Sequence, residues 1–277
     1  MLAAYLSKQA MQIFNKADLR AVKTNKGLSE CLRQLQRIAR SIAATPHERD
    51  NSFAQVSAAF LSRAARQAES VLLLEGSFDS WLIVRSFIEG YAVYAWLESE
   101  PSERQNRSRL YGDVAYLEAH TLRTRLGRNM GVESTPFSKF IQDAAQSYQE
   151  LDAKEGMKIA KGEEADPIGH LKRITGKSLK AVFEDLDRKL DSGDTHKVIY
   201  ELHYSIFSGY HHWSPLYFTI SQTGEFEYYD VTPSNYGIGL VTFIGAFIGM
   251  CLVADEFFQT GYKNEIIALQ QRYENLI

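Results

Sequence analysis

Apolar residues recur at steps of three and four along most of this chain of 277 residues, the spacing that puts side chains on one face of a helix. In the first half of the chain the pattern predicts helices over residues 2–22, 28–44, 45–74, 77–99 and 101–127. Gly27 is expected to end the first of these, because glycine commonly follows the last turn of a helix. Thr45-Pro46-His47-Glu48 is expected to begin the third, since threonine caps helices and proline suits the first helical position.

The helical pattern continues in the second half of the chain, with one extended stretch between helices. Residues 195–213 and 265–276 have helical spacing. LYFTIS and EFEYYDV are rich in β-branched and aromatic residues and are separated by Gln222-Thr223-Gly224, which predicts a β-hairpin near residues 216–231. The sequence therefore predicts an all-α protein, a multi-helix bundle with one short β-hairpin.

The composition is that of one globular protein. We expect a single helical domain over residues 1–277, in which N-terminal helices in 1–76 pack on a core of 77–260. The net charge of -3 argues against a generally basic surface for nucleic acid, although a local basic patch is compatible with it. The two cysteines lie far apart without CxxC spacing and no secretion signal is evident, so a cytoplasmic location is expected.

The segment from Tyr236 to Ala254 carries no charge and is long enough to cross a membrane. Glycine and hydroxyl residues dilute its hydrophobicity and no positive cluster flanks it. We therefore interpret it as a central buried helix, and a membrane is not expected among the partners of this chain.

Two charged residues interrupt the apolar stripe of the helix predicted over residues 77–99. Arg85 and Glu89 are four residues apart, so they are neighbours on the face that carries the tryptophans. Burying a charge is costly unless it is paired and hydrogen-bonded. A partner from elsewhere in the chain is therefore expected.

Tyr204, Ser208 and His212 recur at four-residue steps in the helix predicted over residues 195–213. They form a row of hydrogen-bonding groups along one face, which we expect to meet Arg85 and Glu89. Two interpretations stay open. The five residues are either a buried structural polar network or a site, in which histidine is the general acid or base and arginine binds an anion.

Metal chemistry is not indicated. Glu201 with His203, and Glu118 with His120, lack the ExxH spacing of a di-metal bundle, so no metal and no cofactor is predicted. His196 and His170 stand in polar surroundings and are expected at the surface. The arginines of residues 101–128 are interpreted as a solvated face paired with Glu103 and Glu118, with a phosphate-contacting strip as the alternative.

The segments RSFIEG and YSIFSGYHHWS resemble the two signature segments of a bacterial all-helical family catalogued only as a domain of unknown function. Members of that family carry an Arg-xxx-Glu helix and then a Tyr-xxx-Ser-xxx-His helix. The matching positions are Arg85, Glu89, Tyr204, Ser208 and His212, and the resemblance implies a site there. Some members look like phage-defence proteins.

A weaker similarity connects the chain to the helical ribonucleases of the HEPN type. Those use an arginine and a histidine on one helix, usually across a dimer interface and without metal, to assist attack of the ribose 2′-hydroxyl on the adjacent phosphate. Here Arg85 and His212 lie on different predicted helices, which departs from that pattern. Similar spacing occurs at Arg40 and His47, but Pro46 intervenes, and His47 is interpreted as a first-turn residue without a special role.

These observations predict a metal-independent ribonuclease-like effector in phage defence or toxin activity. His212 would be the acid or base, Arg85 the phosphate partner, and Glu89 would orient one of them. The expected partners are RNA or another phosphate-bearing ligand, an operon-encoded protein, and further copies of the chain as a homo-oligomer. The alternative is a non-catalytic interaction or ligand-sensing module, in which the same residues form a structural polar network.

Overall fold

The computed structural model describes both ends of the chain and separate stretches of its middle. The described residues are 2–48, 50–75, 77, 79–112, 177–190, 195–204, 207–208, 218–220, 226–228 and 233–277. Helices dominate these stretches, which confirms the all-α class.

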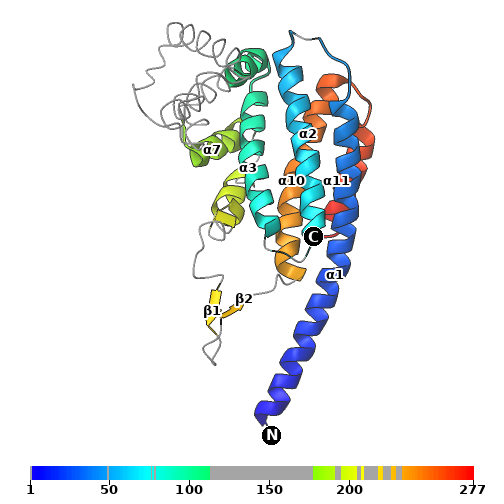
Figure 1. Cartoon of the computed structure of the whole chain (residues 1–277), viewed down its shortest axis with the longest axis vertical. Helices are drawn as coiled ribbons and strands as arrows, with labels where there is room; N and C mark the ends of the chain where they lie inside the picture. The colour runs from blue at the N-terminus through cyan, green and yellow to red at the C-terminus, as the bar shows by residue number, and fades with distance from the viewer. Residues whose placement is uncertain are drawn as a thin grey trace, which may run out of the picture.

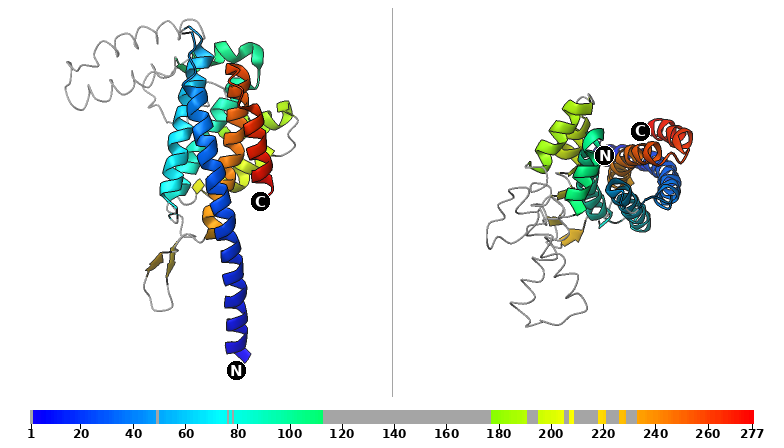
Figure 2. Two further views of the ribbon diagram at one scale, coloured as in Figure 1. Left: turned by 90° about the vertical axis from the view of Figure 1, so that its right-hand side faces the viewer. Right: turned by 90° about the horizontal axis from the view of Figure 1, so that it is seen from above.

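Long helices lie side by side and form the body of the fold (Figure 1). They are α1 (Leu2–Ala43), α2 (Ser52–Leu73), α3 (Asp79–Glu98), α10 (Pro233–Phe258) and α11 (Lys263–Glu274). α10 packs against α1, α2 and α3, although it follows them by more than a hundred residues. Figure 2 shows that the first half of α1 runs beyond the ends of the other helices.

The remaining described elements are short. They are the 3-10 helix η1 (Pro101–Glu103), α7 (Leu179–Leu190), α8 (Thr195–Val198), the π-helix η2 (Ile199–Tyr204), and strands β1 (Phe218–Ile220) and β2 (Phe226–Tyr228). The two strands pair antiparallel, with Phe218 opposite Tyr228. Residues 221–225 between them lie outside the described residues, so the hairpin near residues 216–231 stays a prediction.

α10 runs through the core of the bundle. Leu240, Phe247 and Cys251 are fully buried, and Phe243 stacks on Phe87 of α3 with ring centres 3.8 Å apart. Among the described residues, α10 is the one helix that is long and apolar enough to cross a membrane. In its most apolar stretch, 61% of the residues are buried inside the bundle. This burial agrees with the interpretation of the uncharged segment as a central helix.

The prediction that Gly27 ends a helix is wrong, because α1 continues without a break to Ala43. A glycine inside a helix costs about 1 kcal/mol relative to alanine, so its presence here needs another reason. A Cβ atom at this position would lie 2.8 Å from Leu276 Cδ2. Gly27 therefore allows the C-terminal segment to approach α1 closely.

The third predicted helix begins later than expected. α2 starts at Ser52, and the side chain of Asn51 caps it by accepting a hydrogen bond from the Ala54 N–H at 3.0 Å. The Thr45 N–H instead donates to the Ile42 carbonyl at the end of α1. The predicted start at Thr45 is wrong for this reason, and His47 is an exposed residue of the connection between the two helices.

Candidate functional site

Arg85, Glu89 and Tyr204 meet in the structure. The Tyr204 hydroxyl donates a hydrogen bond to Glu89 Oε1 at 3.0 Å, and Arg85 Nη2 donates to the Tyr204 hydroxyl at 3.4 Å. Arg85 Nη2 also lies 3.5 Å from Glu89 Oε1. The contact joins α3 to η2 across 119 residues of sequence, and the expected meeting of the two polar rows is present for these three residues.

The members of this cluster differ in their exposure. The Arg85 side chain is 11% exposed, whereas the Glu89 side chain is 42% exposed. The guanidinium carbon of Arg85 also lies 5.5 Å from the ring centre of Tyr204, a cation–π distance. Arg85 Nε is buried and has no hydrogen-bond partner among the described residues. The buried cation therefore keeps one N–H group that its described neighbours do not use.

The environment of Tyr204 keeps its hydroxyl protonated at neutral pH. Burial raises the pKa of the Tyr204 phenol above its ordinary value. The Glu89 carboxylate raises this pKa further, and the hydrogen bond from Arg85 opposes the shift. Tyr204 is thus a hydrogen-bond donor to Glu89 at neutral pH.

Local sequence explains how these side chains are positioned. The Ser77 hydroxyl accepts a hydrogen bond from the Asp79 N–H at 3.1 Å at the start of α3, as the side chain of a helix cap does. Tyr200 stacks on Tyr204 within η2, with ring centres 5.4 Å apart and an interplanar angle of 15°. Single π-helical turns of this kind are frequent at functional sites.

Of the remaining two predicted site residues, the structure describes Ser208 alone. Ser208 is half-buried, one turn after Tyr204, and its side chain makes no hydrogen bond to Arg85, Glu89 or Tyr204. Phe207 beside it is buried against Trp81 of α3, with ring centres 5.3 Å apart. His212 lies outside the described residues. The functional roles of all five residues therefore stay predictions.

Residues 54–226 match the model of a family described as "Family of unknown function (DUF5677)". This stretch is more than half of the chain. The chain belongs to this family. No curated protein and no solved structure matches the chain. The family match spans both α3 and η2, so it includes the whole Arg85, Glu89 and Tyr204 contact.

A second buried cluster lies next to the first and was not predicted. Asp187 of α7 accepts three hydrogen bonds from the start of α8: from the backbone N–H and Nδ1 of His196, at 2.9 and 2.7 Å, and from the Lys197 N–H at 2.9 Å. The Tyr91 hydroxyl of α3 lies 3.0 Å from His196 Nε2. His196 is 5% exposed and Asp187 8% exposed, so the prediction of a surface His196 is wrong.

One signal in the sequence could have found this cluster. Asp187 sits next to Leu186 and four residues after Phe183, a spacing that places it beside apolar residues on one face of its helix. A carboxylate on an apolar face requires a partner, as Arg85 does. The polar neighbours of His196 in the sequence suggested exposure, but the backbone N–H groups around it bind the same carboxylate.

The buried phenol of Tyr91 is expected to make the stability of this protein sensitive to alkaline pH. Burial, together with the negative charge of Asp187, raises the pKa of Tyr91 to about 12, whereas an unfolded tyrosine ionises near pH 10. The stability that the protonated phenol contributes is therefore complete below about pH 10 and is lost as the pH rises towards about 12. We expect urea unfolding at pH 9 and pH 11 to show a smaller loss of stability in Tyr91→Phe than in wild type. An identical loss in both proteins would contradict this assignment.

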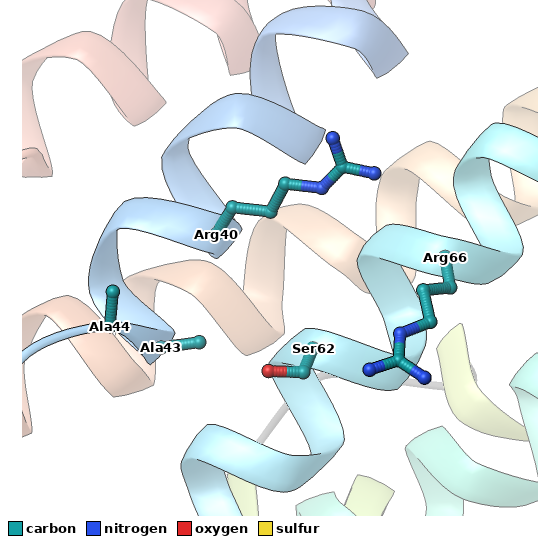
Figure 3. A pocket seen from close by; sticks show the side chains of 5 residues that line it. All are labelled: Arg40, Ala43, Ala44, Ser62 and Arg66. Atoms are coloured by element: carbon teal, nitrogen blue, oxygen red, sulfur yellow. The ribbon is translucent and has the colours of Figure 1, made fainter.

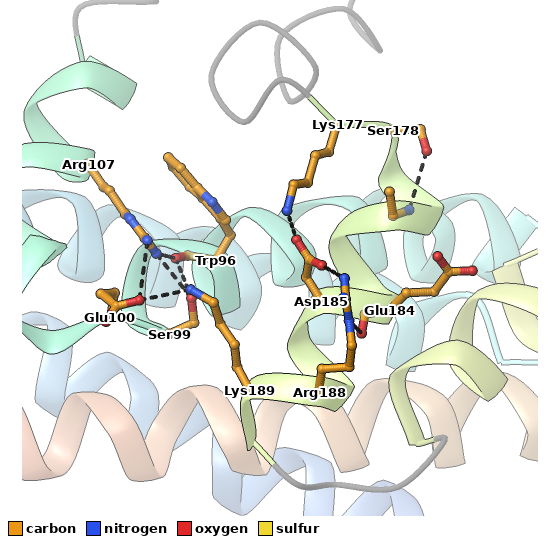
Figure 4. A network of polar contacts seen from close by, with 11 residues as sticks. Trp96, Ser99, Glu100, Arg107, Lys177, Ser178, Glu184, Asp185, Arg188 and Lys189 are labelled. Atoms are coloured by element: carbon orange, nitrogen blue, oxygen red, sulfur yellow. Dashed lines mark hydrogen bonds and ion pairs between the residues drawn. The ribbon is translucent and has the colours of Figure 1, made fainter.

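The arginines after α3 support its C-terminal end. Arg107 Nη1 donates to the Trp96 carbonyl at 2.6 Å, and Lys189 Nζ lies 2.9 Å from Glu100 Oε2, as Figure 4 shows. Arg104 pairs with Glu98 at 2.9 Å. Arg104 and Arg107 thus contact residues at the end of α3 and form no ion pair with Glu103 in the described part of the chain, whereas Glu118 lies outside the described residues.

A small pocket lies between α1 and α2 (Figure 3). Its volume is about 270 Å³, and it is lined by Arg40, Ala43, Ala44, Ser62 and Arg66. The Arg40 guanidinium is 2.6 Å from Glu69 Oε2, so its charge is already compensated. Within the described stretches, no group of three or more histidine, cysteine or acidic residues has an arrangement that could hold a metal ion.

Proposed function

We propose that this protein is a metal-independent, ribonuclease-like effector that acts on RNA or another phosphate-bearing ligand, in phage defence or as a toxin. The observation that carries the proposal is the buried guanidinium of Arg85, whose Nε has no partner among the described residues. Burying a cation lowers stability unless it is fully compensated, so an arginine with an unused donor suits a site that receives an anion. Phosphate oxygens are the natural partner of such a group.

The proposed reaction is a transesterification within RNA. The ribose 2′-oxygen attacks the adjacent phosphorus while a base takes its proton, and the bond from phosphorus to the 5′-oxygen breaks as an acid protonates that oxygen. His212 is the proposed acid or base, because imidazole titrates near neutral pH. Arg85 stabilises the charge on the phosphoryl oxygens, and Glu89 holds Arg85 in orientation. Ser208 is a hydrogen-bond donor to the same ligand, whereas Tyr204, whose O–H is donated to Glu89, holds Glu89 and Arg85 in place.

The test is an RNA cleavage assay with the purified chain in excess EDTA. We expect products with 2′,3′-cyclic phosphate ends. In His212→Ala we expect the cleavage rate to fall by at least about 100-fold. His47→Ala is the matched control, because His47 is exposed and carries the alternative Arg40 and His47 spacing. Full activity in His212→Ala, or its loss in His47→Ala alone, would remove the proposed assignment.

A second candidate function has its own supporting observation. Glu89 already neutralises Arg85, and Tyr204 hydrogen-bonds to both, which is the pattern of a structural polar network. On this alternative the chain is a non-catalytic interaction or ligand-sensing module. It would bind a partner without cleaving RNA. Substitution of Arg85 would then lower the stability of the protein and have no separate effect on RNA cleavage.

The proposal includes a cytoplasmic location, self-association and the β-hairpin near residues 216–231. A lone hairpin is marginally stable, so its edge favours packing on another chain. Light scattering of the purified chain, compared with a variant in which the EFEYYDV strand carries Tyr228→Lys, tests this part. A monomer at all concentrations would contradict self-association.

A further inference from the structure

Two parts of one short segment attach to the same helix. α8 and η2 follow each other directly from Thr195 to Tyr204. Near the start of this segment, His196 Nε2 contacts the hydroxyl of Tyr91 on α3. At its end, the Tyr204 hydroxyl contacts Glu89, two residues before Tyr91 on the same helix.

The first attachment has a defined direction of hydrogen bonding. The carboxylate of Asp187 is only an acceptor, so His196 Nδ1 carries the proton in the 2.7 Å contact between them. In the neutral imidazole, Nε2 is then an acceptor, and the Tyr91 hydroxyl donates to it at 3.0 Å. Asp187 also holds the backbone of α8 through the N–H groups of His196 and Lys197. The imidazole and the first turn of α8 are therefore fixed together.

Aromatic packing connects the two attachments. Phe183 of α7 lies 6.2 Å from the rings of both His196 and Tyr200. Tyr200 in turn stacks on Tyr204 at 5.4 Å. Rings at these separations pack in direct contact, so a continuous row of packed rings joins His196 to Tyr204. The π-helical backbone of η2 carries both tyrosines.

We propose that Asp187, His196 and Tyr91 are positioning residues of the candidate site, which fix α8 and η2 so that Tyr204 is held against Glu89 and Arg85. They do not contact the ligand. This inference rests on the proposed function for the role of the site, but the positioning itself is independent of any RNA chemistry.

The experiment follows Tyr204 itself. The full chain is labelled with tyrosine carrying ¹³C at Cζ, the Tyr204 signal is assigned by its loss in Tyr204→Phe, and its ionisation is followed by NMR between pH 8 and pH 11.5. In wild type we expect the midpoint above the value of about 10 for a solvated tyrosine. In Tyr91→Phe we expect it at least half a pH unit lower, because Tyr204 becomes more solvated.

His196→Asn is the second variant, since its amide still donates to Asp187 but leaves Tyr91 without an acceptor. Tyr236→Phe is the matched control, because it removes a buried phenol hydroxyl that donates to the Val71 carbonyl of α2 at 3.1 Å and not to α8 or η2. We expect the Tyr204 midpoint to fall in His196→Asn and to keep its wild-type value in Tyr236→Phe. An unchanged midpoint in both Tyr91→Phe and His196→Asn, or an equal fall in Tyr236→Phe, overturns the proposal.

RNA cleavage by the same proteins separates the two proposals. If the Tyr204 midpoint moves as expected and wild type cleaves no RNA, the positioning holds and the proposed function fails. If wild type cleaves RNA and the midpoint does not move, the function stands and these three residues are not positioning residues.

Discussion

Replacing Phe87 by alanine is expected to lower the free energy of unfolding by about 3–5 kcal/mol, the usual range for a fully buried phenylalanine. Phe87 is buried, stacks on Phe243 at 3.8 Å and meets Phe247 edge-on at 6.0 Å. The variant loses the transfer energy of the ring and leaves a cavity between α3 and α10. Urea unfolding followed by circular dichroism measures the change.

Leu73→Ala is the control for this prediction. Leu73 is also a large apolar residue in a helix, but it is 80% exposed, so we expect its replacement to change stability by less than about 0.5 kcal/mol. A loss below about 1 kcal/mol in Phe87→Ala would mean that α3 is not held on α10 through this ring. The result matters for the site, because Arg85 and Glu89 lie two residues to either side of Phe87, on roughly the opposite face of α3.

The contact between Arg85 and Tyr204 could be predicted from the sequence because charge on an apolar helix face is energetically demanding. Arg85 had to find polar partners, and the row beginning at Tyr204 was the richest source of them. The same reasoning placed Glu89 on the inward face of its helix, whereas its side chain is half-exposed in the structure. Four-residue spacing sets the direction of a side chain from its helix, whereas exposure depends on which other elements cover that face.

The errors at Gly27 and Thr45 have different physical origins. Glycine as a helix stop is a local rule, and at Gly27 it was overruled by a neighbour that is distant in sequence, because Gly27 leaves room for the side chain of Leu276. At Thr45 the local rule selected the wrong cap, since Asn51 six residues later caps α2. Gln105, which is distant in sequence, also holds the start of α2 by accepting from the Phe53 N–H at 3.1 Å.

The Asp187 and His196 cluster was missed for a different reason. Asp187 accepts two of its hydrogen bonds from backbone N–H groups nine and ten residues later, and any residue type except proline can supply those groups. Only the apolar face around Asp187 signalled the cluster in the sequence. Buried carboxylates that cap a following helix are therefore harder to predict than pairs of opposite charge.

Replacing Glu89 by alanine is expected to lower the free energy of unfolding by about 2–3 kcal/mol. Removing one partner of a buried ion pair costs about 3–5 kcal/mol, and the partial exposure of Glu89 reduces that range. The variant leaves the guanidinium of Arg85 buried without its carboxylate. Glu201→Ala is the control, because Glu201 pairs with Lys180 at 3.2 Å on the surface and its loss is expected to cost less than about 0.5 kcal/mol.

Arg85→Met completes this prediction, and the comparison separates the two candidate functions. Methionine fills a similar volume without charge, and the half-exposed Glu89 that remains can be hydrated, so we expect a change within about 1 kcal/mol of wild type. If Arg85→Met is as stable as wild type and no longer cleaves or binds RNA, the arginine is required for its ligand and not for folding. If Arg85→Met is destabilised as much as Glu89→Ala, the pair is a structural element, and the non-catalytic module becomes the better account of this site.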